Sequence, residues 1–468
     1  MTNHTPNWYQ PKPEQQAKTT ELVVTEPLYR APKTNRRGFL ALAAAAGATA
    51  MGGAGYLLAR DGSPIDRSEP NVALGTEDGA EAVDMTSSRP LAASADVAGR
   101  TLVVVELQGG NDGLATLVPR NAGVLYDQRP DLHIDDAELL DFTDEFGWNP
   151  NLAGLAGHSL AALVGLGSTH SPDGSHFEME RRWWSGKSLG RDLPFTGFFG
   201  RLCDQLVTDQ PVTGVSIGSN ASPALRSDHA VTVGLSDLRA GWFLHSDEPF
   251  YRNMRRAMSA MADGTDSATE MGATESQRLG RARTGLSDTL NFGRSLAEVD
   301  EERIQQIYPQ TELGGLFGAA SELIKQDVGL RVIHLTHGGF DTHADQLGTH
   351  NYLLEQLGDA MGSFLSDLDD SGLSDSTLVC TTSEFGRRVA DNRGGTDHGE
   401  AGMAILSGPV TPGVHGEAPS LTSLNDGNLA TTVDFEQYYA TIAEQWFGIP
   451  SSEVLESGAS PIDGLIAT

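Results

Sequence analysis

Short apolar runs, each followed at once by glycine and polar residues, are the feature that most constrains the fold. Runs that are apolar on both faces suit the central strands of a parallel sheet that helices cover on both sides. Two further stretches, residues 344–370 and 435–447, space their apolar residues as helices do. Strands that alternate with helices predict an α/β fold with a mostly parallel sheet flanked by helices. The six runs are residues 101–107, 160–166, 212–217, 330–335, 377–382 and 402–406.

Composition divides the 468 residues into a leader, a tether and a folded domain. Residues 1–60 are interpreted as the leader. Residues 61–99 are rich in Asp, Glu, Ser, Pro and Ala and lack apolar periodicity, so they are expected to form a flexible acidic tether. Residues 100–468 are predicted to form the α/β domain. Within it, the polar residues 250–300 are expected to form an inserted helical segment that could cap a site.

The leader contains a twin arginine, Arg36 and Arg37, followed by an uncharged stretch rich in Ala and Gly at residues 41–59. This pattern is typical of a twin-arginine export signal. It predicts transport by the twin-arginine (Tat) translocase to the periplasm or the cell surface. The alternative is a permanent anchor in the inner membrane, because the stretch approaches the ~20 residues needed to span a bilayer. Membrane contact is therefore expected only through an uncleaved leader.

Charge and cysteine content exclude several classes of protein. Thirty-two basic residues against 63 acidic ones give a formal net charge of -31, which opposes binding to nucleic acid. An anionic polymer would also be an awkward substrate unless cations or a local basic pocket intervened. The only two cysteines, Cys203 and Cys380, exclude a disulfide scaffold and a four-cysteine zinc site.

Polar side chains at the ends of the predicted strands are the main functional signal, because sites in open α/β sheets gather there. Asp112 ends a Gly-Gly-Asn-Asp motif after the first strand and could bind a cation or cap the next helix. Asp341 and His343 follow the strand at residues 330–335. One carboxylate and one imidazole suit zinc, manganese or iron. The alternative is that Asp341 caps a helix and His343 faces solvent.

Two further motifs flank the later strands. Glu384 and Arg387 follow residues 377–382, where the carboxylate could bind a cation and the guanidinium could hold an anionic oxygen. They could equally form a surface ion pair. Asp397 and His398 precede the last strand, and Asp397 could orient the His398 ring or bind a metal itself.

Ser175 lies before a helical stretch at residues 178–184. At a helix N-terminus its hydroxyl would be close to backbone N–H groups, which suits a nucleophile or an anion site. An ordinary helix cap is the alternative interpretation. Ser175 is not in a Gly-x-Ser-x-Gly setting, so a hydrolase nucleophile elbow is not supported.

Taken in order, the motifs RRGFL, LQGGNDG, SHF, GGFDTH, SEFGR and DH resemble the bacterial exported proteins grouped as domain of unknown function 1501. That family is considered sulfatase-like, within the alkaline phosphatase superfamily, and the resemblance covers about residues 34–450. It implies an alkaline phosphatase-like fold and a divalent metal (zinc, manganese or calcium), with Ser175 as nucleophile. The metal ligands that the resemblance implies are Asp112, Asp341, His343, Glu384 and His398. The residues themselves add Asp397 as a further candidate ligand and Arg387 as the group that would hold the anionic part of the substrate.

The sequence departs from the superfamily pattern in three ways. Alkaline phosphatases place the Asp and His of this metal motif four residues apart, whereas Asp341 and His343 are two apart. The later Asp-His pair is replaced by Ser383 and Glu384. Neither cysteine lies in the Cys-x-Pro-x-Arg setting that a formylglycine sulfatase needs.

Two functions follow from this interpretation. The first is an exported metal-dependent hydrolase of phosphate or sulfate esters that acts on a small anionic ester or glycan. The alternative is a non-catalytic exported binding or assembly protein that keeps the fold, which the departures in the metal motifs favour.

Overall fold

The computed structural model describes residues 99–170, 172–188, 190, 192–206, 212–218, 221–235, 249–264, 273–296 and 298–467. The predicted leader and all of the predicted tether except Gly99 lie outside the described residues. Within these ranges, no helix is both long enough and apolar enough to cross a membrane.

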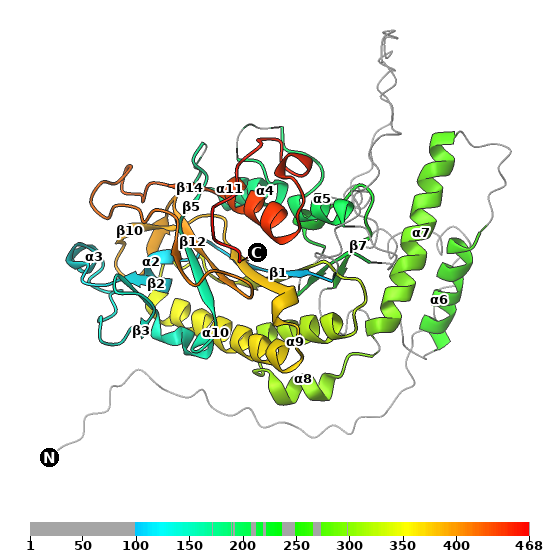
Figure 1. The fold of residues 1–468 in the computed structure, drawn as a ribbon, viewed down its shortest axis with the longest axis horizontal. Coiled ribbons are helices and arrows are strands. Elements are labelled where there is room, and N and C mark those ends of the chain that lie inside the picture. Colours follow the sequence, from blue (N-terminus) through cyan, green and yellow to red (C-terminus); the bar gives the residue numbers. More distant parts are fainter. Residues whose placement is uncertain are drawn as a thin grey trace, which may run out of the picture. The chain divides into compact units, whose positions relative to one another are not determined.

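The described residues form one large sheet of nine strands in the order β13-β5-β12-β9-β1-β8-β6-β7, with β14 paired to β5 (Figure 1). All six predicted runs form strands of this sheet, which confirms the α/β prediction. The strands are β1 (Thr101–Gln108), β5 (Leu160–Gly167), β6 (Gly214–Ile217), β7 (Thr232–Leu235), β8 (Val332–Gly338), β9 (Thr377–Thr382), β12 (Gly402–Ser407), β13 (Gly413–His415) and β14 (Val433–Asp434).

The direction of β12 decides where the loops meet. Strand β1 runs parallel to β8 and β9, and β6 runs parallel to β7 and β8. Strand β12 is antiparallel to both β9 and β5, so β5 shares the direction of β9. A reversed strand begins at the edge where its neighbours end. The loop before β12 therefore reaches the same edge of the sheet as the loops after β1, β5, β8 and β9.

Helices cover both faces of the sheet, and β1 shows how the sequence divides between them. Val103 and Val105 pack into one core cluster, while Leu102 and Val104 pack into the other, as alternating strand side chains must. Figure 1 shows α8, α9 and α10 below the sheet, and α4, α5 and α11 above it. Their bounds are α8 (Glu301–Ile307), α9 (Glu312–Lys325), α10 (Gln346–Asp370), α4 (His176–Ser185), α5 (Phe198–Gln205) and α11 (Phe435–Thr441).

Smaller elements surround this core. Strands β2 (Leu117–Pro119), β4 (Phe146–Trp148) and β3 (Leu140–Asp141) form a small sheet, and β10 (Arg387–Asp391) pairs with β11 (Thr396–His398). Short helices α2 (Gly113–Thr116) and α3 (Gly123–Gln128) follow β1, while 3-10 turns η2 (Pro150–Leu155) and η3 (Pro223–Leu225) precede β5 and β7.

Two helices occupy the region predicted as a helical insertion. Helices α6 (Pro249–Ala262) and α7 (Ala273–Leu296) run side by side beyond β7. They lie at the right of Figure 1, whereas β10 and α2 lie at the left. The end of α7 is anchored because Phe292 and Leu296 are buried in the core.

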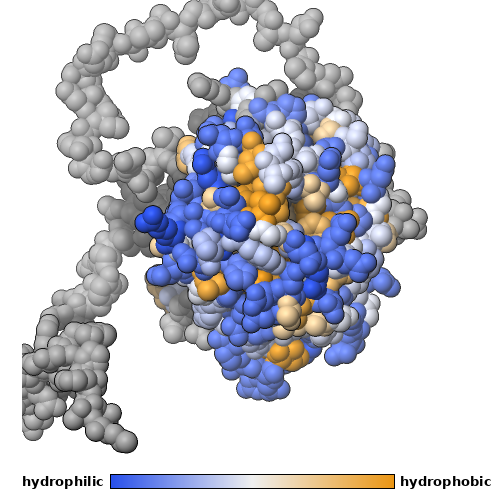
Figure 2. Space-filling model, turned by 90° about the vertical axis from the view of Figure 1, so that its left-hand side faces the viewer, coloured by the Kyte–Doolittle hydropathy of each residue, from blue (hydrophilic) through white to orange (hydrophobic). Residues whose placement is uncertain are grey.

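The surface shown in Figure 2 is mostly hydrophilic, as the many charged residues lead one to expect, and the two cysteines do not form a disulfide. Figure 2 shows the side that lies at the left of Figure 1, where hydrophilic residues dominate and hydrophobic ones gather in a few patches. Cys203 and Cys380 are free and buried. Burial raises the pKa of the Cys380 thiol to about 12, so it stays protonated at neutral pH.

The buried carboxylate of Asp367 on α10 forms ion pairs that connect α10 with α8 and α9. Its side chain is 3% exposed and pairs with Arg303 of α8 and with Lys325 of α9, the latter at 2.6 Å. The Tyr308 hydroxyl donates to it at 2.8 Å and the Ser321 hydroxyl at 2.5 Å. Burial raises the pKa of Asp367, but the hydrogen bonds from Arg303 and the other donors outweigh burial and hold the pKa below its usual range.

We expect Asp367→Asn to lower the free energy of unfolding by about 2 kcal/mol at pH 7, because it removes the charge that four donors share. A carboxyl with a depressed folded pKa contributes stability above its unfolded pKa of about 3.9, and that contribution is lost as the pH falls. The difference from the parent should therefore shrink below about pH 4. Urea unfolding at several pH values measures it. The control is Asp370→Asn, an exposed acid at the end of α10; an equal loss there would contradict the assignment.

Candidate functional site

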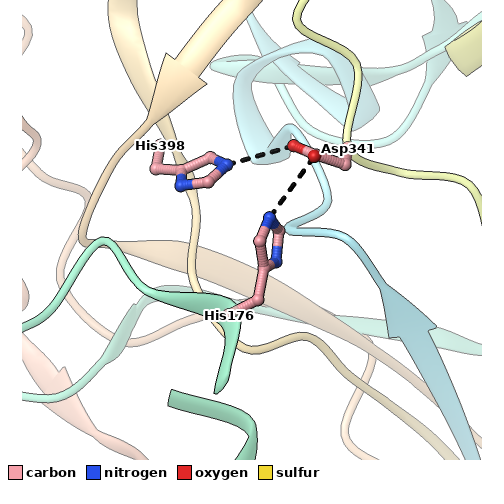
Figure 3. A group of neighbouring side chains, drawn as sticks. All are labelled: His176, Asp341 and His398. Carbon is pink, nitrogen blue, oxygen red and sulfur yellow. Dashed lines mark hydrogen bonds and ion pairs between the residues drawn. The ribbon is translucent and has the colours of Figure 1, made fainter. Parts of the chain in front are cut away.

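Four side chains from three separate loops converge on the edge of the sheet where the strands end. Asp341 follows β8, His398 ends β11 just before β12, and His176 opens α4 after β5. His398 Nε2 lies 3.0 Å from Asp341 Oδ1, and His176 Nε2 lies 3.4 Å from Asp341 Oδ2. Figure 3 shows both rings pointing at the carboxylate. His343 completes the group, with its Nε2 atom 3.1 Å from Asp341 Oδ1.

Each imidazole in this cluster has its Nδ1 atom on an acceptor and its Nε2 atom turned toward Asp341. His398 Nδ1 lies 2.6 Å from the carbonyl oxygen of Gly174. His176 Nδ1 lies 2.7 Å from Glu384 Oε1, and His343 Nδ1 lies 3.3 Å from Asp397 Oδ1. Since a carbonyl or carboxylate oxygen only accepts, Nδ1 carries the proton in the neutral ring. In the neutral rings the lone pairs then sit on Nε2. Each Nε2 atom also faces an oxygen of Asp341, so each of these contacts needs either a cation or a second proton on the ring.

This arrangement fits a metal ion. The Nε2 atoms of His343 and His398 are 2.9 Å apart, and two unprotonated nitrogens at that distance repel unless a cation or a proton lies between them. His176 Nε2 is buried without a hydrogen-bond partner among the described residues. Atoms of His176, Asp341 and His398 all lie within 4.8 Å of one another. Ligands on a tetrahedral zinc with bonds of about 2.0–2.1 Å are separated by roughly 3.3 Å, close to these spacings.

Two carboxylates lie behind the rings rather than in the cluster. Asp397 Oδ1 accepts a hydrogen bond from Asn392 at 3.0 Å and faces His343, not the neighbouring His398. The hydrogen bond from Asn392, with smaller contributions from His343, lowers the pKa of Asp397 despite partial burial. A carboxylate behind a ligating imidazole fixes its orientation and raises its basicity. Asp397 is therefore placed to orient His343.

Glu384 plays the corresponding part for His176. It is 4% exposed, and its Oε1 atom also accepts the backbone N–H of Gly109 at 2.8 Å. The hydrogen bond to Glu384 raises the pKa of His176, while burial opposes the rise. The sequence predicted Glu384 as a metal ligand, and the structure brings it to the site with one oxygen committed to His176 and Gly109.

Arg387 holds the acidic centre of the cluster in place. Its Nη2 atom donates to Asp341 Oδ1 at 2.8 Å, and the side chain is fully buried. Burial raises the pKa of Asp341, but the hydrogen bonds from Arg387 and His398 outweigh it and lower the pKa to about 2. The same Nη2 atom also donates to the carbonyl oxygens of Gly109 and Phe340, while Nε donates to that of Gly110 and Nη1 to that of Thr396. The guanidinium thus positions Asp341. The sequence had suggested instead that it would hold an anionic group.

Asp112 lies in a different network and is not brought to the cluster. It is 1% exposed, caps α2 through the backbone N–H groups of Leu114 and Ala115, and pairs with Arg129 at 2.7 Å. Gln346 donates to its second oxygen at 2.5 Å. Burial raises the pKa of Asp112, but Arg129 and the hydrogen bonds outweigh it and lower the pKa. The helix-cap alternative therefore describes its position, and these partners leave it no free oxygen for a metal.

Glycine at position 109 lets the loop after β1 pass between the other site loops. Gly109 has a φ of 116°, and a Cβ there would lie 2.3 Å from the backbone nitrogen of Asp341. No other residue fits that approach. The Gly-Gly-Asn-Asp motif, predicted as a cation loop, thus serves to pack the loops after β1 and β8 together.

Ser175 and His176 show what the sequence reasoning missed. Ser175 is the N-cap of α4, is exposed, and makes no side-chain cap hydrogen bond. Its neighbour His176 supplies one of the three imidazoles of the cluster, whereas the sequence alone pointed to Ser175 in the Ser-His-Phe motif. The signal was present, because a histidine beside a candidate nucleophile at a strand end is as suitable a ligand as His398.

A family model described as "Protein of unknown function (DUF1501)" matches residues 249–457. These residues include Asp341, His343, Glu384, Arg387 and His398, whereas His176 precedes them. No curated protein matches the chain.

Several solved structures are distantly similar to this chain. The lipoteichoic acid synthase LtaP from Listeria monocytogenes is 10% identical, with a TM-score of 0.35, over 79% of this chain and 76% of that one. The PsFucS1 sulfatase from Pseudoalteromonas sp. is 12% identical, with a TM-score of 0.34, over 79% and 73%. An alkaline phosphatase superfamily protein from Vibrio parahaemolyticus is 10% identical, with a TM-score of 0.36, over 74% and 66%.

We expect Glu384→Gln to lower the pKa of His176, because the substitution removes the carboxylate that stabilises the protonated ring. The measurement is an NMR titration of the His176 ring in metal-free protein, assigned with a His176→Ala variant. The control is Glu400→Gln, whose carboxylate accepts from Asn425 and Asn428 instead. An unchanged His176 pKa in Glu384→Gln, or an equal fall in Glu400→Gln, would contradict the assignment.

Proposed function

We propose that this chain, whose residues 249–457 match the model of the family described as "Protein of unknown function (DUF1501)", binds a divalent metal ion and hydrolyses phosphate or sulfate esters. The observation that supports the proposal most is the set of three imidazoles whose Nε2 atoms face one carboxylate while acceptors occupy their Nδ1 atoms. Without a cation, each ring would need a second proton on Nε2 to meet the carboxylate of Asp341. A bound cation would satisfy the three nitrogens and the carboxylate together.

Asp341, His398 and His176 would hold the ion, with His343 as a further ligand. One carboxylate and several imidazoles suit zinc or manganese, whereas calcium prefers an all-oxygen shell. Arg387 keeps Asp341 ionised, so that this ligand carries a full negative charge at any physiological pH. When bound, such an ion neutralises negative charge on the oxygens of an ester.

Ser175 is the residue of this chain that could attack the ester. The carbonyl of Gly174, the preceding residue, is held by His398, so the loop carrying Ser175 is tied to the cluster. Its exposed hydroxyl is free of a capping bond. In the proposed reaction, Ser175 Oγ bonds to phosphorus or sulfur and the ester oxygen leaves with a proton. Water then cleaves the serine ester, which restores the hydroxyl and releases the acid.

The non-catalytic alternative has one observation in its favour. Arg387, the guanidinium expected to hold the anionic group, is directed to backbone carbonyls and Asp341. A metal-binding protein without turnover would keep the imidazole cluster and lack that clamp. Metal binding and hydrolysis must therefore be measured separately.

Export is proposed from the leader alone. The twin arginine and the uncharged Ala- and Gly-rich stretch support transport by the twin-arginine translocase, which would place the domain in the periplasm or at the cell surface.

We expect the purified chain to bind about one zinc or manganese ion at the cluster of Asp341, His176, His343 and His398. His398→Ala should weaken binding by more than about 100-fold, because a direct ligand matters at least as much as the groups that orient it. Metal content by mass spectrometry and calorimetric titration measure both. The control is His133→Ala, an exposed histidine paired with Asp135 at 3.0 Å. Equal metal binding by the parent and His398→Ala would overturn the metal site.

Hydrolysis is tested on a panel of aryl phosphate and sulfate esters with the metal-loaded chain. Ser175→Ala should lower kcat by more than about 1,000-fold while metal binding is retained, because it removes the nucleophile and leaves the ligands intact. Metal binding without turnover of any ester would favour the non-catalytic alternative. Turnover that survives Ser175→Ala would remove the serine from the mechanism.

A leader fusion tests export. Changing Arg36 and Arg37 to Lys should retain a fluorescent fusion in the cytoplasm, because the export route reads the arginine pair. Fractionation and microscopy measure its location. Changing Lys33, also in the polar leader, to Arg serves as the control. Export that is indifferent to the twin arginine would refute the proposal.

A further inference from the structure

A groove with two exposed phenylalanines and two arginines lies along α4, the helix that begins with His176 of the cluster. It has a volume of about 340 Å³, within the range of small-molecule pockets. Phe177 and Phe195 are 69% and 61% exposed, which places them among the most exposed large apolar side chains of the described residues. The groove is lined further by Arg181, Trp184, Pro223 and Arg226.

One wall of the groove is a stripe of α4 that starts beside the proposed metal ligand. Phe177, Arg181 and Trp184 are spaced by four and three residues, so they share one face of the helix. His176 precedes Phe177 by one residue, which places it about 100° around the helix axis. The same helix thus presents an imidazole to the cluster and the stripe to the groove.

The opposite wall is fixed by tight backbone packing. The backbone N–H of Gly197 donates to the carbonyl of Arg226 at 2.8 Å. A Cβ at Gly197 would lie 2.2 Å from the carbonyl oxygen of Ala224, so only glycine permits this approach. Arg201 holds the carbonyl of Thr196 at 2.8 Å from the other side. Phe195 and Arg226 therefore project from a rigid frame.

Charge in the groove is opposite in sign to that of the chain. The Arg226 guanidinium lies 5.5 Å from the ring centre of Phe195, and no carboxylate of the described residues pairs with it. The Arg181 guanidinium lies 5.2 Å from the ring of Phe177 and is partly balanced by Glu178 at 3.2 Å. A guanidinium stacked on a ring keeps its N–H edge available for a carboxylate or a sulfate. In a chain of net charge -31, this is a local basic and aromatic surface.

We propose that the groove binds the organic part of the substrate, and that this part is a ring that carries its own negative charge. The exposed aromatic side chains and Trp184 take the apolar faces of the ring, and Arg226 takes the charge. For its role in substrate choice the inference rests on the proposed ester hydrolysis; the binding itself does not need the metal. The substrate class is then a ring-bearing ester with a second anionic group remote from the reacting one.

Binding is tested on the full chain after chelator treatment, so that the outcome does not depend on the metal or on turnover. The probes are 2-naphthoate, which has ring and charge, 2-naphthalenemethanol, which has the ring alone, and acetate, which has the charge alone. Naphthoate should bind at least about tenfold more tightly than either, because each partial probe forfeits one set of contacts. Calorimetry gives the affinities. Equal affinity for naphthoate and naphthalenemethanol would overturn the proposal.

Matched variants locate the binding. Arg226→Gln should remove the preference for naphthoate over naphthalenemethanol, whereas Arg252→Gln, an exposed arginine on α6, should leave it unchanged. Phe195→Ala should weaken both ring probes, whereas Phe250→Ala, which removes a 62% exposed ring on α6, should not. Arg181→Gln provides a second test of the charge, and circular dichroism confirms that each variant is folded. Identical effects of the groove and α6 variants would overturn the assignment.

A competition assay separates this inference from the proposed function. If the metal-loaded chain hydrolyses an ester, naphthoate should inhibit it competitively, and Arg226→Gln should abolish the inhibition. Tight naphthoate binding with no turnover of any ester would leave the groove standing and refute the hydrolase. Turnover that naphthoate does not affect would retain the hydrolase and refute the groove as its substrate subsite.

Discussion

The rest of the site depends on the hydrogen bonds that the buried guanidinium of Arg387 makes. It joins the loop after β1, through Gly109 and Gly110, to the loop after β8, through Phe340 and Asp341. It also holds the carbonyl of Thr396 at the start of β11. A buried cation of this kind is costly unless every donor is satisfied. Here its acceptors are backbone carbonyls of the site loops and the carboxylate of Asp341. The N–H groups of Arg387 are therefore paired only when these loops have come together as the site.

The three imidazoles acquire their orientation from groups that lie outside the cluster. Glu384, Asp397 and the Gly174 carbonyl each engage an Nδ1 atom, and each comes from a different loop at the same edge of the sheet. This shared edge follows from the reversed direction of β12, which brings the residues before it to the ends of its neighbours. Strand direction and ring orientation are therefore coupled: without the antiparallel β12, His398 would lie at the opposite edge.

The elements could be predicted because burial on both faces leaves a plain mark, an unbroken apolar run such as residues 101–107. The meeting of Asp341, His343 and His398 could also be predicted, because strand ends share an edge. The partner that each polar group takes could not be predicted. Asp112 and Arg387 carry the expected chemistry, yet one is neutralised by Arg129 and the other is directed inward, and those choices depend on three-dimensional packing rather than on spacing along the chain.

The acidity of the chain bears differently on the cluster and on the groove. A negative surface raises the local concentration of cations, which favours loading of a carboxylate and imidazole site. The same surface repels an anionic ester, so an anion must be met by local positive charge. The cluster offers none that faces outward, since Arg387 is fully engaged. A bound metal would supply that positive charge at the reacting group. Arg226, in the groove along α4, would supply it at the rest of the substrate. Under these proposals, the two positive centres would together select a substrate with two negative groups.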